Sequence, residues 1–530
     1  CGLVRVPLQR AAMGKRKSLM FGLVAVLCSV VSGDLPAHCV MQDVAGEWVF
    51  QMTEPSNMSH INSCGHAQPN DVRSMLAINA RHIVPPNSRN ITLHLTTEVV
   101  KGSGNNKKLI ARDSLGNVGQ WTMIFDMAFE ASVGGRTYFA NFLFTPLKGA
   151  EITNKDRWDD IAEVRGRPSD AGRLKHSGNK YVCHRDATSS VFFTEAVPPS
   201  YSQSRGCFFG RRQGAVDQSV VLVGDDGKGK TVFTTKNMTV KRLTLPPVPK
   251  SFLHSSLPKQ FNWYTELKKV APPNIDPLAD QFDQGACGSC YAFSAVMVLA
   301  MRFRIALYKK YGVFQPVELS YKAAARCSSW SEGCNSGYAF PVFKFAHEQG
   351  VPPAHSACDA EDLGYDMKCD WGCYEHEPEL FFAKDYGYVG GFALGSTEDD
   401  MMREIYANGP VTVSISTRTV QEFYSGNDGH TMTNFDGDVP SEQSASNSSA
   451  IKAWQYTTHS ILATGWGEEE VDGKLEKYWH IRNSWGTDWG DGGYGKIRRG
   501  HNDAAVEALG VWVLPDIDRL PQSTLAQVAA

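Results

Sequence analysis

The cysteine residues constrain the fold of this chain more than any other feature of its sequence. The 530 residues include 13 cysteines, of which Cys1 and Cys28 lie in an N-terminal segment that we expect to be removed, leaving 11. In an oxidising compartment an odd number leaves one free, reactive thiol after the others have paired. The remaining cysteines fall into two groups, which predicts two separately cross-linked units: Cys39, Cys64, Cys183 and Cys207 in the first half, and Cys287, Cys290, Cys327, Cys334, Cys358, Cys369 and Cys373 in the second.

The N-terminal segment has the features of a secretory signal peptide. Basic residues at 15–17 precede an apolar run over 19–31, and cleavage after Gly33 would give a mature chain that begins at Asp34. We interpret residues 1–33 as an upstream extension, with Met13 as the start, followed by the signal. A membrane anchor is the alternative, but the apolar run is shorter than the roughly 20 residues that cross a bilayer, and we expect no membrane span. The secretory route makes four sequons candidate glycosylation sites: Asn57, Asn90, Asn237 and Asn447.

Composition excludes several classes of partner. Hydrophobic residues make up 42% and charged residues 21%, which is typical of a packed globular protein. The formal net charge of −3 provides no bulk positive field, so no nucleic-acid partner is expected. At roughly 150 residues per domain, the length predicts two or three domains.

The two halves differ in their secondary-structure patterns. In the first half, short alternating runs over 48–52, 91–99, 121–129 and 137–144 predict strands of an antiparallel sheet or barrel. A turn cluster and a proline-rich run then predict a linker or excisable segment over 214–256. The clearest helix begins at Cys290 and ends at Gly312, and residues 424–455 predict an exposed loop that is open to proteolysis.

One cysteine lies in a run that predicts a nucleophile. The run begins at Gln284 and reads QGACGSCY, which places Cys290 at the start of the predicted helix. The partial positive charge at a helix N-terminus lowers the pKa of a thiol and favours the thiolate. A buried structural cysteine is the alternative, and it is weakened because Cys287 is the natural disulfide-forming residue of the run.

The second cysteine group also allows a metal interpretation. The spacing of His355, Cys358, Cys369 and Cys373 is loosely compatible with a zinc site. Because the secretory context favours disulfides, we expect no metal.

Three other residues would supply what a reactive thiol needs. His459 stands at the head of an apolar strand-like run and is the candidate base. Asn483 follows a second such run and can hold the imidazole in one tautomer, while Trp485 can shield that hydrogen bond from water. Gln284 is the candidate oxyanion donor, together with the backbone N–H of Cys290.

With these residues, the region from about 257 to 514 resembles the papain (C1) family of cysteine peptidases, with Cys290 as nucleophile, His459 as base and Asn483 as orienting residue. The resemblance implies an α+β fold with a papain-like catalytic domain of two lobes, one helical and one β-barrel-like, and a cleft between them. It also implies three disulfides: Cys287–Cys334, Cys327–Cys369 and Cys358–Cys373.

Within that family, the first half resembles the cathepsin C (dipeptidyl peptidase I) group. The likeness is carried by the runs DLPAHC from Asp34 and GEWVFQ from Gly46, and by Tyr291, where most papain-like enzymes carry tryptophan. It implies an N-terminal antiparallel β exclusion domain that blocks the cleft beyond the second substrate residue. The carboxylate of Asp34, as the first mature residue, would bind the free α-amine of the substrate. The implied disulfides of this domain are Cys39–Cys183 and Cys64–Cys207.

The resemblance implies further features of the site and of maturation. The backbone of Gly337 would contact substrate, as would Trp485. One of the two tyrosines of the family's chloride site matches Tyr388, but the other position holds Phe340, so the match to a chloride site is incomplete. No metal or organic cofactor is implied. An activating protease would cut near 214–256 and 436–455, the assembly would be a homotetramer, and the location would be a lysosome, a lysosome-like vacuole or the outside of the cell.

The sequence therefore predicts a peptidase in five segments. These are the extension and signal at 1–33, the exclusion domain at 34–213, the propeptide-like linker at 214–256, the peptidase domain at 257–515 and a C-terminal tail at 516–530. The predicted function is a thiol dipeptidyl peptidase that acts on peptides and proteins with free N-termini through an acyl-enzyme. The alternatives are a papain-like endopeptidase with an open cleft and a catalytically silent protein that binds N-termini.

Overall fold

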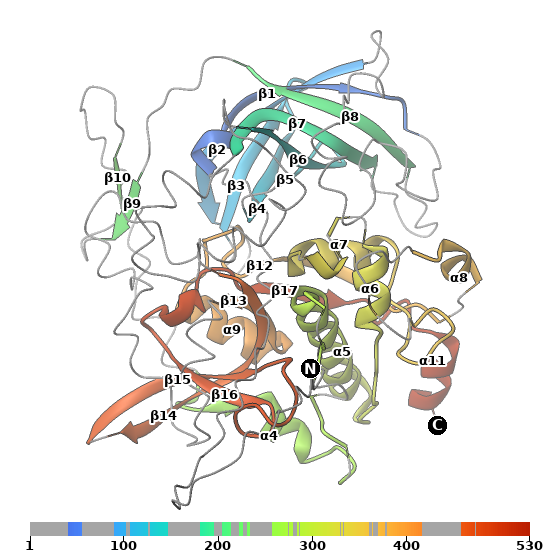
Figure 1. Cartoon of the computed structure of the whole chain (residues 1–530), viewed down its shortest axis with the longest axis vertical. Coiled ribbons are helices and arrows are strands. Elements are labelled where there is room, and N and C mark those ends of the chain that lie inside the picture. Colours follow the sequence, from blue (N-terminus) through green and yellow to red (C-terminus); the bar gives the residue numbers. More distant parts are fainter. Residues whose placement is uncertain are drawn as a thin grey trace, which may run out of the picture.

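A computed structural model of the chain shows a β-barrel lying above a larger domain that contains both helices and a sheet (Figure 1). The structure describes residues 41–55, 89–101, 107–125, 128–146, 181–194, 204–213, 222–225, 230–233, 257–273, 275–278, 283–285, 287–328, 330–331, 333–335, 337–359, 363, 369–376, 379–415, 457–471 and 473–529. The signal segment, Asp34 and the loop at 436–455 lie outside these residues.

The barrel is closed and antiparallel, and each of its strands pairs with the next in sequence. A short helix, α1 (Met41–Val44), precedes it. The strands are β1 (Gly46–Met52), β2 (Arg89–Lys101), β3 (Lys107–Asp113), β4 (Val118–Ile124), β5 (Ala128–Val133), β6 (Arg136–Pro146), β7 (Tyr181–Thr194) and β8 (Ser204–Arg212). Closure of β8 onto β1 satisfies both sheet edges and confirms the predicted antiparallel sheet or barrel.

Aromatic side chains fill the barrel. Alternate residues of β1 point inward, because side chains along a strand alternate between its two faces. Trp48 meets Phe129 with ring centroids 5.2 Å apart, and Phe50 meets Phe208 at 4.5 Å. This packing gives the first half of the chain a hydrophobic core of its own.

One sequence prediction in this half needs correction, and the structure adds detail to a second. The predicted strand over 121–129 is two strands, because the chain turns after Ile124 and Phe125 takes a positive φ of 50°. The predicted linker over 214–256 contains a hairpin, β9 (Leu222–Asp225) and β10 (Lys230–Phe233), on either side of the predicted turn cluster.

The second domain is built around a long central helix. α5 (Cys290–Tyr311) ends at Gly312, whose φ of 74° is the left-handed conformation that glycine adopts readily, as predicted. It packs against α6 (Tyr321–Cys327) and α7 (Ala339–Glu348), and also against strands of the sheet. α5 is long and apolar enough to cross a membrane, but 89% of its apolar window is buried inside the protein. We therefore assign it to the core.

The sheet of this domain forms the second lobe. Its main order is β12 (Ala383–Tyr388), β17 (Val511–Pro515), β13 (Val411–Ile415), β14 (His459–Val471), β15 (Lys474–Arg482) and β16 (Tyr494–Arg498). β11 (Phe261–Asn262) pairs with β14 and leads into α4 (Trp263–Lys268). The other helices are α8 (Trp371–His376), α9 (Glu398–Asn408) and α11 (Gln522–Ala529); the last lies in the segment predicted as a tail.

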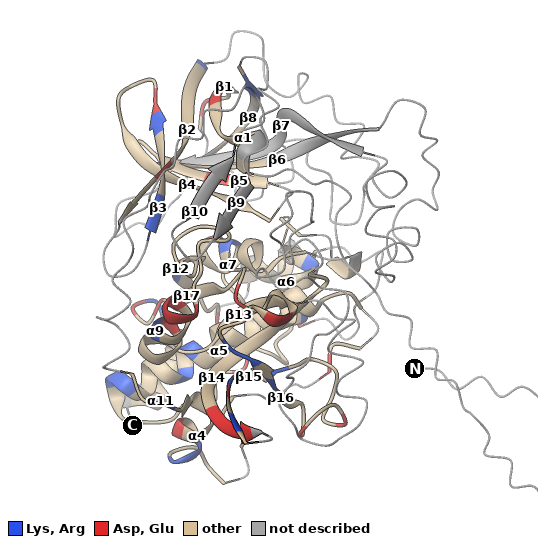
Figure 2. Ribbon diagram, turned by 90° about the vertical axis from the view of Figure 1, so that its left-hand side faces the viewer, with Lys and Arg blue, Asp and Glu red and all other residues tan. Residues whose placement is uncertain are grey.

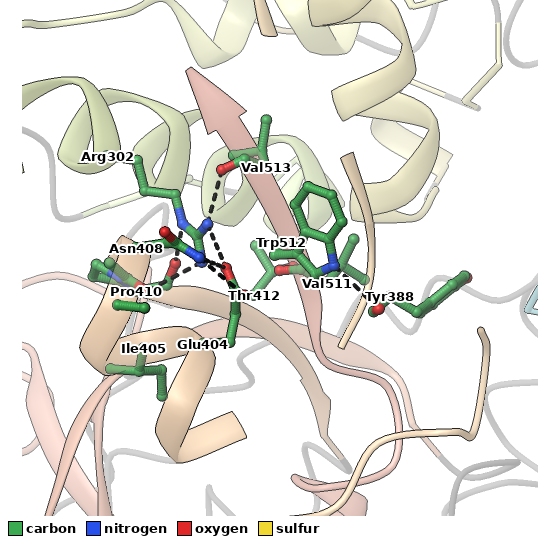
Figure 3. Close-up of polar contacts among 12 residues, drawn as sticks. Arg302, Tyr388, Glu404, Ile405, Asn408, Pro410, Thr412, Val511, Trp512 and Val513 are labelled. Carbon is green, nitrogen blue, oxygen red and sulfur yellow. Dashed lines mark hydrogen bonds and ion pairs between the residues drawn. The ribbon is translucent and has the colours of Figure 1, made fainter. Parts of the chain in front are cut away.

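A buried arginine joins the two lobes (Figure 3). Arg302, on α5, donates to the backbone oxygens of Gly409, Pro410 and Val513 and pairs with Glu404 of α9 at 2.8 Å. The planar guanidinium can bind several acceptors at once, so one side chain ties α5 to α9, β13 and β17.

Both views place the barrel directly above α7 and β12 (Figures 1 and 2). The backbone N–H of Lys107, on β3, donates to the oxygen of Gly390, and the N–H of Ala393 donates to the hydroxyl of Thr122 on β4. The loop after β12 therefore contacts the rim of the barrel, at β3 and β4, through its own main-chain groups.

The disulfides of the described residues are those that the family resemblance implied. Bonds join Cys287 to Cys334, Cys327 to Cys369 and Cys358 to Cys373. The zinc interpretation is therefore wrong, because its three thiols are engaged in disulfides. Cys207 is also disulfide-bonded, but the predicted pairs Cys39–Cys183 and Cys64–Cys207 fall partly outside the residues whose side chains are described.

Candidate active site

The free thiol lies at the start of α5. Cys290 is half-buried and is the free cysteine of the described part of the chain. The disulfide between Cys287 and Cys334 anchors the turn before it, and the backbone N–H of Gly288 donates to the oxygen of Cys334. The odd thiol expected from the cysteine count is therefore Cys290, on a cross-linked turn.

The imidazole of His459 is held in one tautomer. Its Nε2 lies 2.7 Å from Oδ1 of Asn483, and both side chains are buried. An amide oxygen can only accept, so Nε2 carries the proton and Nδ1 keeps its lone pair. The same Oδ1 accepts from the backbone N–H of Ser484 at 2.8 Å, which fixes the amide orientation. His459 and Asn483 are thus arranged as the sequence predicted, with Nδ1 available as a base.

A tryptophan covers this pair. The Trp485 ring stacks on His459 with centroids 4.7 Å apart and an interplanar angle of 23°. Trp489 in turn meets Trp485 edge-on at 6.1 Å. Trp485 therefore lies where it can shield the imidazole from water, as predicted.

Gln284 is fixed by the loop that carries Asn483. Its backbone N–H donates to the oxygen of Ser484 at 2.9 Å, and the Ser484 hydroxyl donates to Gln284 Oε1. Its amide nitrogen donates to the oxygen of Cys287 at 2.9 Å. That nitrogen carries two hydrogens, so one remains for another acceptor.

Two serines that the sequence analysis did not single out connect α5 to β14. The hydroxyls of Ser294 and Ser460 lie 2.6 Å apart, and both side chains are buried. The backbone N–H of Ser460, the residue after His459, also acts on the Cys290 thiol and favours its ionised form. This contact brings the thiol beside the histidine. Hydroxyl-bearing residues within apolar runs were the only sequence signal for the Ser294–Ser460 pair.

Burial opposes ionisation of both groups. It raises the pKa of the Cys290 thiol to about 11, although backbone N–H groups of Ser460, Tyr291 and Cys290 itself act in the opposite direction. Burial also lowers the pKa of His459 to about 4, partly offset by its bond to Asn483. Burial therefore acts against the lowered thiol pKa that the sequence predicted.

Gly337 and Tyr388 lie on the side of the peptidase domain that faces the barrel. A Cβ on Gly337 would lie 2.8 Å from the ring of Tyr291, the residue after Cys290, so only glycine fits there without a shift. Tyr388 stacks on Phe340 with centroids 4.9 Å apart, and its hydroxyl accepts from the backbone N–H of Phe125 on the barrel. Asn90 is exposed, as a glycosylation site must be.

Comparison with known proteins agrees with this arrangement. Residues 257–512 match the family model described as papain family cysteine protease, and residues 34–156 match the one described as cathepsin C exclusion domain. The chain is a papain-family cysteine peptidase of the cathepsin C type.

Three curated relatives match different lengths of this chain. Cathepsin C of Schistosoma mansoni is 26% identical over 508 residues, which cover 90% of this chain and 94% of that protein. Dipeptidyl aminopeptidase 1 of Plasmodium falciparum (isolate 3D7) is 28% identical and covers 66% of this chain, while the match spans 58% of that longer protein. Cathepsin Z of Onchocerca volvulus is 33% identical over 40% of this chain and 61% of its own length.

Proposed function

We propose that this cathepsin C-type peptidase removes dipeptides from the free N-termini of peptides and proteins through a thioester on Cys290. The observation that carries the proposal is the contact between the barrel and the segment beside the thiol. Phe125 of the barrel stacks on Tyr338 with ring centroids 4.5 Å apart, and Tyr338 follows Gly337. A barrel in this position can limit how many substrate residues fit on the N-terminal side of the bond that is cleaved.

The chemistry follows from the proton positions. His459 Nδ1 accepts the proton of the Cys290 thiol as the sulfur attacks the peptide carbonyl. The backbone N–H of Cys290 and the remaining N–H of Gln284 stabilise the oxyanion. The C–N bond then breaks, His459 returns the proton to the leaving amine, and a thioester remains. Water, deprotonated by His459, attacks the thioester, which releases the dipeptide acid and restores the thiol.

Through the family resemblance, we assign to Asp34 the choice of which peptide bond lies at the thiol. A substrate ammonium that enters a partly desolvated site needs an anion, and a carboxylate at the mature N-terminus would hold it. Cleavage would then fall after two residues, with the backbone of Gly337 and the ring of Trp485 contacting the substrate.

We assign no reaction step to a cofactor, because the thiol, imidazole and amide groups complete the chemistry. The family's chloride site needs two tyrosine hydroxyls. Phe340 offers no donor, and its ring packs flat on Tyr388, so the residues present do not fit that site.

Maturation and location are proposed on the same resemblance. An activating protease would cut within 214–256 and near 436–455, and the product would assemble as a homotetramer. The disulfides fit a secretory route to a lysosome, a lysosome-like vacuole or the cell exterior.

The test compares two fluorogenic dipeptide substrates that differ only in a free or an acetylated N-terminus. The enzyme is purified, matured protein whose N-terminus is sequenced, with Cys290→Ala as the control. We expect cleavage of the free substrate alone, with no activity in the control.

Two other outcomes would replace the proposal. Equal or faster cleavage of the acetylated substrate would identify an endopeptidase with an open cleft. No cleavage of either substrate by protein that begins at Asp34 would identify a silent N-terminus-binding protein.

A further inference from the structure

A buried cluster of charges lies where the barrel meets α7. Glu130, on β5 of the barrel, accepts from the hydroxyl of Tyr386 on β12 at 3.0 Å and pairs with Lys344 of α7 at 3.2 Å. Lys344 also pairs with Glu348, one turn further along α7, at 2.8 Å. One carboxylate of the barrel therefore reaches two elements of the peptidase domain.

These charges are removed from water. The side chains of Lys344, Glu348 and Glu130 are 0%, 1% and 11% exposed. The Lys344 ammonium also lies 5.4 Å from the ring centroids of both Phe139 and Trp330. In such surroundings a misplaced charge is costly, because neither water nor salt screens it.

Glu130 differs from Lys344 and Glu348 in which domain it comes from and in whether its charge is balanced without the other domain. Lys344 and Glu348 belong to one helix and balance each other without the barrel. Glu130 comes from the other domain, and its carboxyl reaches both Lys344 and Tyr386 only when β5 lies over α7. In some proteins, buried ionic groups select one arrangement among several even where they add little net stability.

We propose that Glu130 is a positioning residue that fixes where the barrel sits on the peptidase domain, and thereby limits the length of substrate that the site accepts. Its effect on substrate length rests on the proposed exopeptidase function, whereas its effect on barrel placement does not. The neighbouring turn supports the role, because Phe125 reaches Tyr338 from the same pair of barrel strands.

The central test is the charge reversal Glu130→Lys in the matured full chain. It would place two ammonium groups and one carboxylate in the buried cluster, so we expect the barrel to leave its position. Amide hydrogen exchange in β5 and α7 should become about tenfold faster or more, and a long peptide with a blocked N-terminus should become a substrate. Glu98→Lys is the matched control: it makes the same change on an exposed barrel residue and should alter neither readout.

Two further variants separate placement from general damage. Glu130→Gln keeps an acceptor for Lys344 and Tyr386 and, below pH 4.5, where the wild-type carboxyl is also uncharged, should retain wild-type exchange. Adding Lys344→Met to Glu130→Lys leaves one cation facing Glu348 and should restore most of the protection.

Amide exchange tests the positioning role, and cleavage of blocked peptides tests the exopeptidase function, so one can be contradicted without the other. Unchanged exchange in Glu130→Lys, or the same acceleration in Glu98→Lys, would overturn the positioning role. If the wild-type enzyme itself cleaves blocked peptides, the exopeptidase function fails, and exchange in β5 and α7 still decides where Glu130 acts.

Discussion

At the scale of single residues, one amide organises the site. The Asn483 oxygen accepts from both the His459 imidazole and the Ser484 backbone N–H. Through Ser484 the same loop fixes Gln284, so the tautomer of the base and the position of the oxyanion donor depend on a single short turn. Geometry prepares this pair, while burial opposes the ionisation of both Cys290 and His459.

Asn483→Ala should lower kcat/KM for the free-amine dipeptide substrate by about 10²-fold, because nothing would then hold the Nε2 proton of His459 away from the thiol. Asn483→Asp keeps an acceptor for the imidazole and should lose less of its kcat/KM. Steady-state kinetics measure both variants, and thermal melting confirms that they fold. Equal activity of the alanine variant and the wild type would show that Asn483 does not orient the base.

The proposed catalytic residues were predictable from the sequence because each belongs to a short local pattern. Cys290 opens a helix, while His459 and Asn483 flank apolar runs that became β14 and β15. Glu130 was not predictable. It occupies an outward-facing position of a strand, where a charged residue usually meets water, and its partners lie far along the chain. The burial that acts against ionisation of Cys290 was missed for a similar reason, since burial is a property of the whole fold.

At the scale of elements, the sequence pattern predicted some ends of helices and strands correctly and missed others. The helix from Cys290 to Tyr311 was predicted because its spacing and the following Gly312 agree. The turn between β4 and β5 was missed, because apolar residues continue through it and Phe125 is not a residue that usually takes a positive φ. Contact with Tyr338 of the other domain accounts for an apolar side chain at that turn.

Arg302→Met should destabilise the peptidase domain by about 3–5 kcal/mol. The substitution would leave three buried carbonyl groups without this donor and Glu404 without its cation (Figure 3). Urea unfolding measures the loss. Arg112→Met, in an exposed ion pair of the barrel, is the control and should cost less than about 1 kcal/mol. Similar losses for the two variants would show that Arg302 does not join the lobes.

Gly391→Ala tests the main-chain contact between the loop after β12 and the barrel. A Cβ there would lie 1.7 Å from the backbone oxygen of Lys107, so the loop must move away from β3. Gly473 also has a positive φ, but a Cβ there would meet nothing within 4 Å. Both alanine variants carry backbone strain of about 1 kcal/mol, and only Gly391→Ala should also speed amide exchange in β3. Equal exchange in the two variants would contradict the contact.

At the scale of the whole molecule, specificity is a question of how two domains are joined. The barrel has its own aromatic core, and the peptidase domain has α5, its sheet and its disulfides. Backbone contacts, the aromatic contacts of Phe125 with Tyr338 and of Phe139 with Trp330, and a buried charge cluster hold them together. Such a junction can shift without unfolding either part, so conditions that change its charges should change which substrates are accepted.

Lower pH should stabilise the docking of the barrel on the peptidase domain. Burial raises the pKa of Glu130 above its ordinary 4.5, although Lys344 and Tyr386 act in the opposite direction and Glu348 adds to the rise. Tyr388 and, beyond Tyr386, His347 also face this group. A carboxyl whose pKa is higher in the docked state takes up a proton on docking. Its contribution is therefore complete below pH 4.5 and is lost as the pH rises through the raised value.

Glu130→Gln has no such proton to gain. Its α7 amide exchange, taken as a ratio to that of the wild type, should therefore change as the pH rises above 4.5 and the wild-type junction loosens. The Glu98→Gln control should stay parallel to the wild type, because that carboxylate is exposed. A constant ratio for Glu130→Gln would show that the carboxyl keeps one protonation state throughout, and the pH response of substrate selection would then have to originate in the site around His459.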